Sequence, residues 1–509
     1  MNLYPPRLRL TTSWLWLWLG LLIVSFPLIL YRWFQQLGLP FFALSADDFS
    51  RTLLAWRVTQ GQLIPSDVWL PLQFWVGALA YQFYPHWRVV PMLINLLAAT
   101  GTLVCLLGIG YEIGLRTWAL LLQLLLMATL PWFVWLSLSG LSEPLFCFWI
   151  ALAALSLLRW QNYGQRWVIW GAALSLLAAN ATRFDAWGVS ALFSLYLAWR
   201  WVRVASPRPH YLLLVAALPW LFPMAWMGYH GLKYGDPFFS THAVRAYILA
   251  RQGTKPLLSR LLLQFQDLWQ VGTIIIPLGL IGAWGMRKRR TIQLLALLWL
   301  GVWLMLMGSA LQSATASHNT PRLVVLPTLL LVPCAVWALT QIGALRLGGR
   351  WLILLLITAL VVVQLNTIPH YPNNFAPEIW AVGRHLIDLR ATGQLCPGDP
   401  ILIEVKFWDY LALQVLTDDP AAVVFDRNSK LLFTPAGTPI LDDANNPSLF
   451  ARSTADLQVE LARRQIRFVL AYTDVASTTL QTVAQQSWQA GDYTLFLLAQ
   501  EADPPPCGK

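Results

Sequence analysis

Long apolar runs separated by short polar gaps dominate residues 1–366. A helix needs about 20 mostly apolar residues to cross a bilayer, so each run is a candidate span. The pattern predicts a polytopic α-helical membrane domain with about eleven transmembrane helices, several of them short. They lie at residues 14–31, 88–110, 117–136, 142–158, 167–181, 184–199, 210–228, 269–285, 292–310, 321–340 and 350–366. The first run has no clear small-residue cleavage site and is interpreted as a retained helix.

Basic residues fall in every second gap between these runs, and the strongest cluster is Arg287–Arg290. Cytoplasmic loops carry an excess of Lys and Arg, so these gaps and the N-terminus are predicted to be cytoplasmic. This order requires that residues 70–84 do not span. We therefore expect an interfacial helix there, within a first outer loop at residues 32–87. The other gaps, including a long loop at residues 229–266, then face outward.

The pattern changes after residue 366. Buried strands are predicted at Ile401–Val405, Phe468–Tyr472 and Tyr493–Ala499, and helices at Ala376–Arg390 and Thr454–Gln465. Strands that alternate with helices predict a small extracytoplasmic α/β domain at residues 367–509. That location would permit a disulfide between Cys396 and Cys507, whereas the three other cysteines lie in apolar runs.

Composition agrees with the membrane interpretation. The chain is 57% hydrophobic and only 12% charged, whereas soluble domains are about one quarter charged. Its formal net charge is +11, which in a soluble protein would suggest nucleic acid as a partner. Here the basic residues sit in short loops between apolar runs. Membrane topology explains most of them, and no nucleic-acid partner is expected.

Two adjacent carboxylates, Asp47 and Asp48, directly follow the first apolar run. Carboxylates are costly near hydrocarbon, so a pair at this boundary suggests a site. A carboxylate can take the proton from an attacking hydroxyl, and a second one can orient the acceptor. We expect Asp47 to act as the base and Asp48 to support it. The alternative is a solvated loop with an ordinary helix N-cap.

Glu143, Arg183 and Asp185 lie in two further outward gaps. Glu143 follows Ser142 and precedes Pro144, which is an ordinary helix start, but it could also bind a substrate hydroxyl or a divalent metal. Arg183 and Asp185 could form a local ion pair on a tight turn. The functional alternative gives Arg183 a phosphate to neutralise and Asp185 the role of fixing the arginine.

Asp236, His318 and Arg322 are the last candidates. Asp236 lies in the turn Tyr234–Pro237, which opens a basic outer loop that could lie on lipid headgroups or cover an anionic lipid. His318 and Arg322 precede a late span, where a helix N-terminus with cationic side chains can bind phosphate. Alternatively, Arg322 extends its charged end toward the membrane surface.

Carboxylates and cations on one membrane face suit attack on a lipid-linked phospho-sugar. A polyprenyl phosphate leaves as a stable anion, so the reaction needs cations for the leaving group and a base for the incoming hydroxyl. Single displacement would invert the anomeric centre.

At these residues the chain resembles the GT-C superfamily of polyprenyl-phosphate-sugar glycosyltransferases, in the branch of protein O-mannosyltransferases and lipid A aminoarabinose transferases. The family's acidic pair is matched by Asp47-Asp48, and its interfacial helix by Leu70–Tyr84. Its acidic residue before a span is matched by Ser142-Glu143-Pro144. Its Gly-Asn/Asp-Pro loop is matched by Tyr234–Pro237, and its late Arg-containing segment by His318–Pro327. The resemblance implies a GT-C-like fold and a hexosyl- or pentosyltransferase. It also implies a polyprenyl-phosphate-linked sugar donor, surrounding membrane lipids, and an extracytoplasmic glycan, lipid or protein hydroxyl as acceptor.

Two departures from the family pattern bear on the site. Leu70-Pro71-Leu72 stands where many relatives have His-Pro-Pro, which supplies a metal ligand in some of them. A divalent metal is therefore possible but not implied. Asp48 stands where close relatives have Glu.

Two other classes of function stay open. One is a transporter or flippase of lipid-linked intermediates, although no predicted span carries a charge near its middle. The other is a non-catalytic scaffold whose α/β tail is a binding module.

Overall fold

The structure is a computed structural model that describes residues 13–203, 209–252, 256–311, 320–343, 347–372, 375–405, 409–427, 447–472 and 474–498. It has two compact units. The helical unit contains the residues up to Trp33, Ser66–Gln73 and Leu93–Tyr371. The sheet unit contains Phe34–Pro65, Phe74–Met92 and the residues from Pro372 onward. Parts of the first predicted outer loop thus fold with the C-terminal segment.

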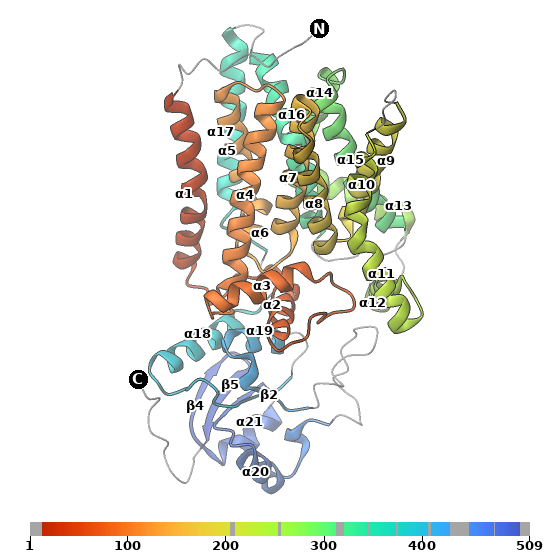
Figure 1. Ribbon diagram of the computed structural model, residues 1–509. Coiled ribbons are helices and arrows are strands. Elements are labelled where there is room, and N and C mark those ends of the chain that lie inside the picture. Colours follow the sequence, from red (N-terminus) through yellow and green to blue (C-terminus); the bar gives the residue numbers. More distant parts are fainter. Residues whose placement is uncertain are drawn as a thin grey trace. The chain divides into compact units, whose positions relative to one another are not determined.

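The helical unit is a bundle of helices (Figure 1). Its elements are α1 (Ser13–Leu37), α4 (Val90–Glu112), α5 (Thr117–Ala128), α6 (Pro131–Leu138), α7 (Glu143–Tyr163), α8 (Arg166–Thr182), α9 (Asp185–Arg203), α10 (Tyr211–Ala217), η1 (Leu218–Trp220), α11 (Leu221–Tyr234), α12 (Phe239–Gln252), α13 (Leu257–Gly272), α14 (Ile275–Gly285), α15 (Arg290–Leu311), η2 (Thr320–Val324), α16 (Val325–Gly343) and α17 (Leu347–Thr367).

Six stretches of the described chain are helices long and apolar enough to cross a membrane: Trp16–Leu37, Val90–Glu112, Glu143–Tyr163, Tyr211–Tyr234, Arg290–Leu311 and Pro321–Ile342. Two bent pairs, α5 with α6 at 63° and α13 with α14 at 93°, raise the number to eight if each pair is one span. The protein is therefore a multi-pass membrane protein. The predicted count of about eleven is not confirmed, because other predicted spans form shorter or less apolar helices such as α8 and α9.

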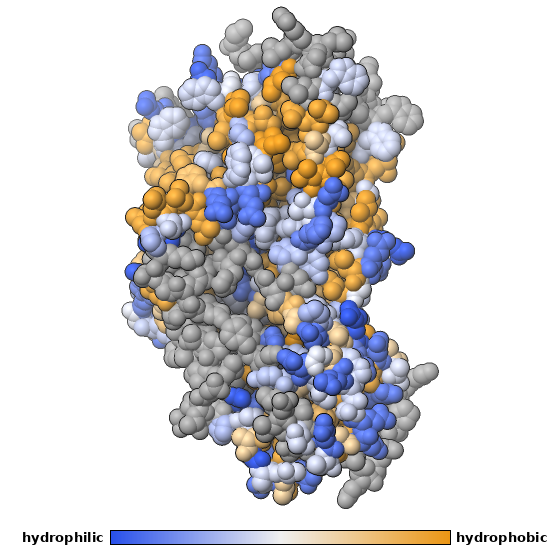
Figure 2. Space-filling view, turned by 180° about the vertical axis from the view of Figure 1, so that it is seen from behind, coloured by the Kyte–Doolittle hydropathy of each residue, from blue (hydrophilic) through white to orange (hydrophobic). Residues whose placement is uncertain are grey.

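Large apolar side chains remain exposed over much of the helical unit, as expected for helices that face lipid. Figure 2 shows hydrophobic side chains gathered over these helices.

Glycines allow some of these helices to pack closely. A Cβ atom on Gly282 of α14 would lie 1.9 Å from the carbonyl oxygen of Cys334 on α16. A Cβ atom on Gly301 of α15 would lie 2.8 Å from the Cα atom of Val189 on α9. Small residues at such crossings bring helix backbones into contact, which is a common way to pack helices in lipid.

The sheet unit is built around five strands in the order β2-β1-β3-β5-β4. The strands are β1 (Ile401–Ile403), β2 (Val423–Phe425), β3 (Phe468–Ala471), β4 (Ala484–Ala490) and β5 (Tyr493–Leu498). β2, β1 and β3 are parallel, and β5 and β4 are antiparallel additions. Three of these strands were predicted, as were two helices, α18 (Pro377–Ala391) and α20 (Thr454–Arg463). The predicted α/β fold class is confirmed.

Alternate residues of each central strand enter two cores, one on each face of the sheet. Ile401 and Ile403 of β1 point into one core, together with α18 and α19 (Asp409–Leu416). Leu402 points into the other core, with α20 and α21 (Asp474–Gln481). The first core also contains Phe49 of α2 (Ala46–Thr59), the helix whose first turn carries the acidic pair. The sheet unit further contains most of α3 (Leu72–Phe83), within the stretch predicted as an interfacial helix.

Candidate functional site

Four of the predicted site residues meet in the helical unit. Glu143 begins α7, Arg183 follows the last residue of α8, Asp185 begins α9, and Arg322 lies in η2 just before α16. Pro144 in the first turn of α7 has no N–H to leave unpaired, so it favours a helix start beside Glu143. The ends of four elements thus bring together charges that are far apart in the sequence.

Glu143 lies between the two arginines. Its Oε1 atom is 2.9 Å from Nη1 of Arg183 and 3.1 Å from Nε of Arg322. Arg183 also donates from Nε to Asp185 at 2.8 Å and from Nη1 to Ser142 at 3.3 Å. The ion pair between Arg183 and Asp185 that the sequence allowed is therefore present, and it continues into a larger cluster.

These charges are shielded from solvent. The exposed side-chain fractions are 4% for Glu143, 9% for Arg322 and 15% for Arg183. Burial makes a charge costly unless partners compensate it, and here two acids and two bases balance each other. The guanidinium of Arg183 also lies 5.8 Å from the centre of the Phe146 ring, close enough for a cation–π interaction. The cluster places two fixed positive charges in a poorly hydrated part of the molecule.

The acidic pair lies at the start of α2 in the sheet unit. Asp48 is completely buried, and its Oδ2 atom accepts hydrogen bonds from the backbone N–H groups of Leu44 at 3.0 Å and Ser45 at 2.9 Å. It thus satisfies donors at the helix N-terminus, as the third residue of a capping box does. Asp47 is only half-buried. The same helix start therefore holds Asp48 in place and leaves Asp47 partly accessible.

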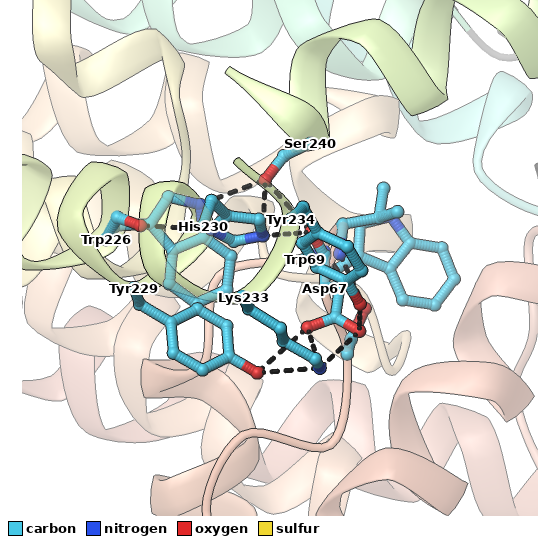
Figure 3. Close-up of polar contacts among 10 residues, drawn as sticks. Asp67, Trp69, Trp226, Tyr229, His230, Lys233, Tyr234 and Ser240 are labelled. Atoms are coloured by element: carbon cyan, nitrogen blue, oxygen red, sulfur yellow. Dashed lines mark hydrogen bonds and ion pairs between the residues drawn. The ribbon is translucent and has the colours of Figure 1, made fainter. Parts of the chain in front are cut away.

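A second polar cluster joins the loop at Asp67 to the end of α11 (Figure 3). The Asp67 carboxylate accepts hydrogen bonds from Lys233 at 2.8 and 3.0 Å, from Tyr229 at 3.0 Å and from Tyr234 at 2.6 Å. Desolvation raises the pKa of Asp67, but these hydrogen bonds outweigh it and hold the pKa below its ordinary value.

The backbone of Asp67 is held as well. Its carbonyl oxygen accepts a hydrogen bond from the Ser240 hydroxyl at 2.9 Å and lies 2.9 Å from Nε2 of buried His230. Sequence reasoning missed Asp67 and Lys233. The available signal was the position of Lys233 directly before Tyr234–Pro237, a turn already singled out, while Asp67 is an acid in the first predicted outer loop.

The remaining predicted residues are separate from these clusters or lie outside the described residues. The Asp236 carboxylate accepts hydrogen bonds from Nδ1 of His242 at 2.7 Å and from the N–H of Phe238 at 2.9 Å, and both bonds lower the pKa of Asp236. His318 lies outside the described ranges. Cys396 is disulfide-bonded. Because Cys507 also lies outside those ranges, its pairing with Cys396 remains a prediction.

Metal-ligating side chains do not gather in the described part of the chain: no group of three or more His, Cys, Asp or Glu residues there could hold a metal ion.

Comparison with solved structures identifies the class of fold. ArnT from Cupriavidus metallidurans bound to undecaprenyl phosphate matches 97% of this chain and 100% of its own chain, with a TM-score of 0.63 and 12% sequence identity. The same protein in the apo state matches over 94% and 97%, with a TM-score of 0.57 and 11% identity. The archaeal oligosaccharyltransferase AglB from Archaeoglobus fulgidus, in complex with an inhibitory peptide and a dolichol-phosphate, matches over 96% and 75%, with a TM-score of 0.50 and 12% identity.

The chain therefore shares its fold with ArnT and with the oligosaccharyltransferase AglB, in agreement with the GT-C-like fold that the sequence resemblance predicted. No protein-family model and no curated protein matches the sequence. At this level of identity the structural likeness establishes the fold.

Proposed function

We propose that this protein is an integral-membrane, inverting glycosyltransferase that moves a sugar from a polyprenyl-phosphate donor to a hydroxyl group of an extracytoplasmic acceptor. The observation that carries the proposal is the buried cluster of Glu143, Arg183 and Arg322 in a GT-C fold. The ArnT and AglB neighbours were solved with undecaprenyl phosphate and dolichol-phosphate, respectively. Such lipid phosphates are the leaving groups that this reaction would release.

Each residue has a defined part in the proposed reaction. Asp47 takes the proton of the acceptor hydroxyl while the hydroxyl oxygen forms a bond to the anomeric carbon. The bond between that carbon and the phosphate oxygen breaks on the opposite side, and the lipid phosphate leaves with the electron pair. Arg183 and Arg322 stabilise this departing negative charge, since cations in a poorly hydrated site act strongly. Asp48 positions Asp47 through the start of α2.

The other predicted residues support binding. Glu143 and Asp185 orient the two arginines, consistent with their ion pairs. Asp236 and His318 are proposed to contact the donor.

The site is proposed to face the extracytoplasmic side, with the N-terminus in the cytoplasm. The basic cluster at Arg287–Arg290 and the disulfide at Cys396 both favour this orientation. An alkaline phosphatase fused after Lys509 should be active in a bacterial host, whereas one fused after Arg289 should be inactive. The reverse pattern would contradict the orientation.

The decisive experiment incubates purified protein with radiolabelled undecaprenyl-phosphate sugars and measures the release of undecaprenyl phosphate. One or more donors should be turned over by the wild type. Asp47→Asn should reduce turnover by a factor of about 10²–10⁴, as expected when a general base is removed. Turnover by Asp47→Asn at the wild-type rate, or no turnover of any donor by the wild type, would contradict the proposal.

A further inference from the structure

α13 buries two polar side chains, Gln264 and Asp267, beside the apolar Leu268 and Val271. Gln264 and Asp267 are 0% and 3% exposed. The opposite side of the helix exposes large apolar side chains, namely Leu258, Leu262, Phe265 and Trp269. In a membrane protein, such a helix lines a polar interior site with one face and contacts lipid with the other. α13 therefore holds two polar side chains in the interior of the helical unit.

The amide of Gln264 is the feature of α13 that points to a bound ligand. Neither its Oε1 nor its Nε2 atom has a hydrogen-bond partner within the described part of the chain, and the side chain is fully buried. An unpaired buried polar group is destabilising, and native proteins contain few of them. A ligand that supplies both an acceptor and a donor would remove this cost.

The position of α13 indicates which ligand this is. α13 packs against η2, which carries Arg322, and against α16. Near its C-terminal end, a Cβ on Gly272 would lie 3.1 Å from the hydroxyl of Thr328 on α16. The polar face of α13 thus belongs to the same part of the helical unit as the cluster proposed to bind the phosphate.

We propose that Gln264 binds a hydroxyl group of the donor sugar, on the part of the donor next to the phosphate; this inference rests on the proposed function. A neutral amide offers one acceptor oxygen and two N–H donors, which matches a sugar hydroxyl that both donates and accepts. It carries no charge to neutralise a phosphate, so its role is distinct from that of Arg322. Gln264 is then a residue that selects the sugar, and Asp267 lies one turn away on the same buried face.

Gln264→Met tests this role, because methionine has a similar shape but no hydrogen-bonding amide. Gln123→Met is the matched control: Gln123 on α5 is also fully buried and its Oε1 atom also has no partner in the described chain, but its Nε2 atom donates to the carbonyl oxygen of Leu106. Without ligand, Gln264→Met should have a Tm equal to or above that of the wild type. Gln123→Met should have a lower Tm, because it loses a hydrogen bond inside the protein.

The activity assay uses undecaprenyl phosphate carrying mannose, glucose, galactose or arabinose. For the donor that the wild type turns over best, Gln264→Met should lower kcat/KM about tenfold, the effect of losing one good hydrogen bond. Its affinity for undecaprenyl phosphate without a sugar should stay within about twofold of wild type, since Arg322 is intact.

Three results would overturn the inference. A Tm loss in Gln264→Met equal to that of Gln123→Met would mean a structural role for the amide. Unchanged kcat/KM in Gln264→Met, with normal wild-type turnover, would contradict this inference alone. Absence of turnover by the wild type with every donor would contradict the proposed function itself, and the inference would fall with it.

Discussion

At the scale of single residues, the charged cluster around Glu143 is stable only because each buried charge has a partner of opposite sign. Glu143 contacts both Arg183 and Arg322 and has only 4% of its side chain exposed. Removing one partner from a buried ion pair is far more harmful than the pair is stabilising, because the remaining charge stays buried without compensation. The same carboxylate that positions the arginines is thus also required for the local fold.

We therefore expect Glu143→Gln to lower the free energy of unfolding by about 3–5 kcal/mol. Denaturation of the detergent-purified protein would measure this change. Asp236→Asn is the control, because Asp236 pairs with His242 at a site where 34% of the acid side chain is exposed. Exposed pairs contribute little to stability, because solvent screens them. Equal losses in the two variants would mean that burial does not govern the Glu143 cluster.

The lowered pKa of Asp67 predicts that the folded protein loses stability in acid. Its pKa is lowered in the folded protein, so the folded state binds this proton less readily than the unfolded chain. The stabilisation is present above the ordinary pKa of 3.8 and is lost as the pH falls through the lower, folded-state value. Tm measured from pH 6 downward should fall more steeply below about pH 4 for the wild type than for Asp67→Asn. Parallel curves would show that the carboxylate contributes no acid-dependent stability.

At the scale of elements, close helix crossings determine where the site residues lie. α9 begins with Asp185 and packs against α15, where a Cβ on Gly301 would meet the Cα atom of Val189 at 2.8 Å. The backbone cannot yield as the tip of a flexible side chain can. A larger residue at Gly301 would therefore push α9 away and move Asp185 with it.

Gly301→Ala should destabilise the protein by about 1–3 kcal/mol, the usual cost of overpacking. Gly308→Ala on the same helix is the matched control, because a Cβ there would meet no atom within 4 Å. That control should be neutral or stabilising by up to about 1 kcal/mol, since alanine is the better helix former. Thermal unfolding of both variants measures the difference, and an equal effect at the two positions would rule out a close crossing at Gly301.

At the scale of the whole molecule, the sheet unit contains the helix that carries the acidic pair. Phe49 follows Asp48 directly. The centroid of its ring lies 4.8 Å from the ring centroid of Phe41, 5.0 Å from that of Phe375 and 6.1 Å from that of Trp380. The first predicted outer loop and the C-terminal segment therefore share one core. This gives the C-terminal segment a physical role: it supports the helix on which the proposed base lies.

Phe49→Ala should lower the free energy of unfolding by about 3–5 kcal/mol, as truncation of a buried aromatic does. Sugar transfer should fall as well, because α2 loses a buried contact with the core. Phe83→Ala in α3 is the control, since Phe83 is 83% exposed. Wild-type stability and turnover in Phe49→Ala would show that the acidic pair is positioned by something other than this core.

The sequence alone was sufficient for the features that depend on local pattern. The apolar runs indicated a membrane protein, because the length and hydropathy of a span are properties of one continuous segment. The same holds for three strands of the sheet and for the helix start at Glu143, which are specified by neighbouring residues. The order of weak motifs also indicated the GT-C fold.

Only the tertiary structure decided which distant groups meet. Asp67 and Lys233 are 166 residues apart, and no local pattern relates them. Gln264 lay within a predicted loop, and its buried, unpaired amide has meaning only once α13 is packed against its neighbours. Phe49 likewise belongs to a core that strands some 350–450 residues later complete. Pairing and burial are properties of the folded chain, because they depend on segments that sequence order does not bring together.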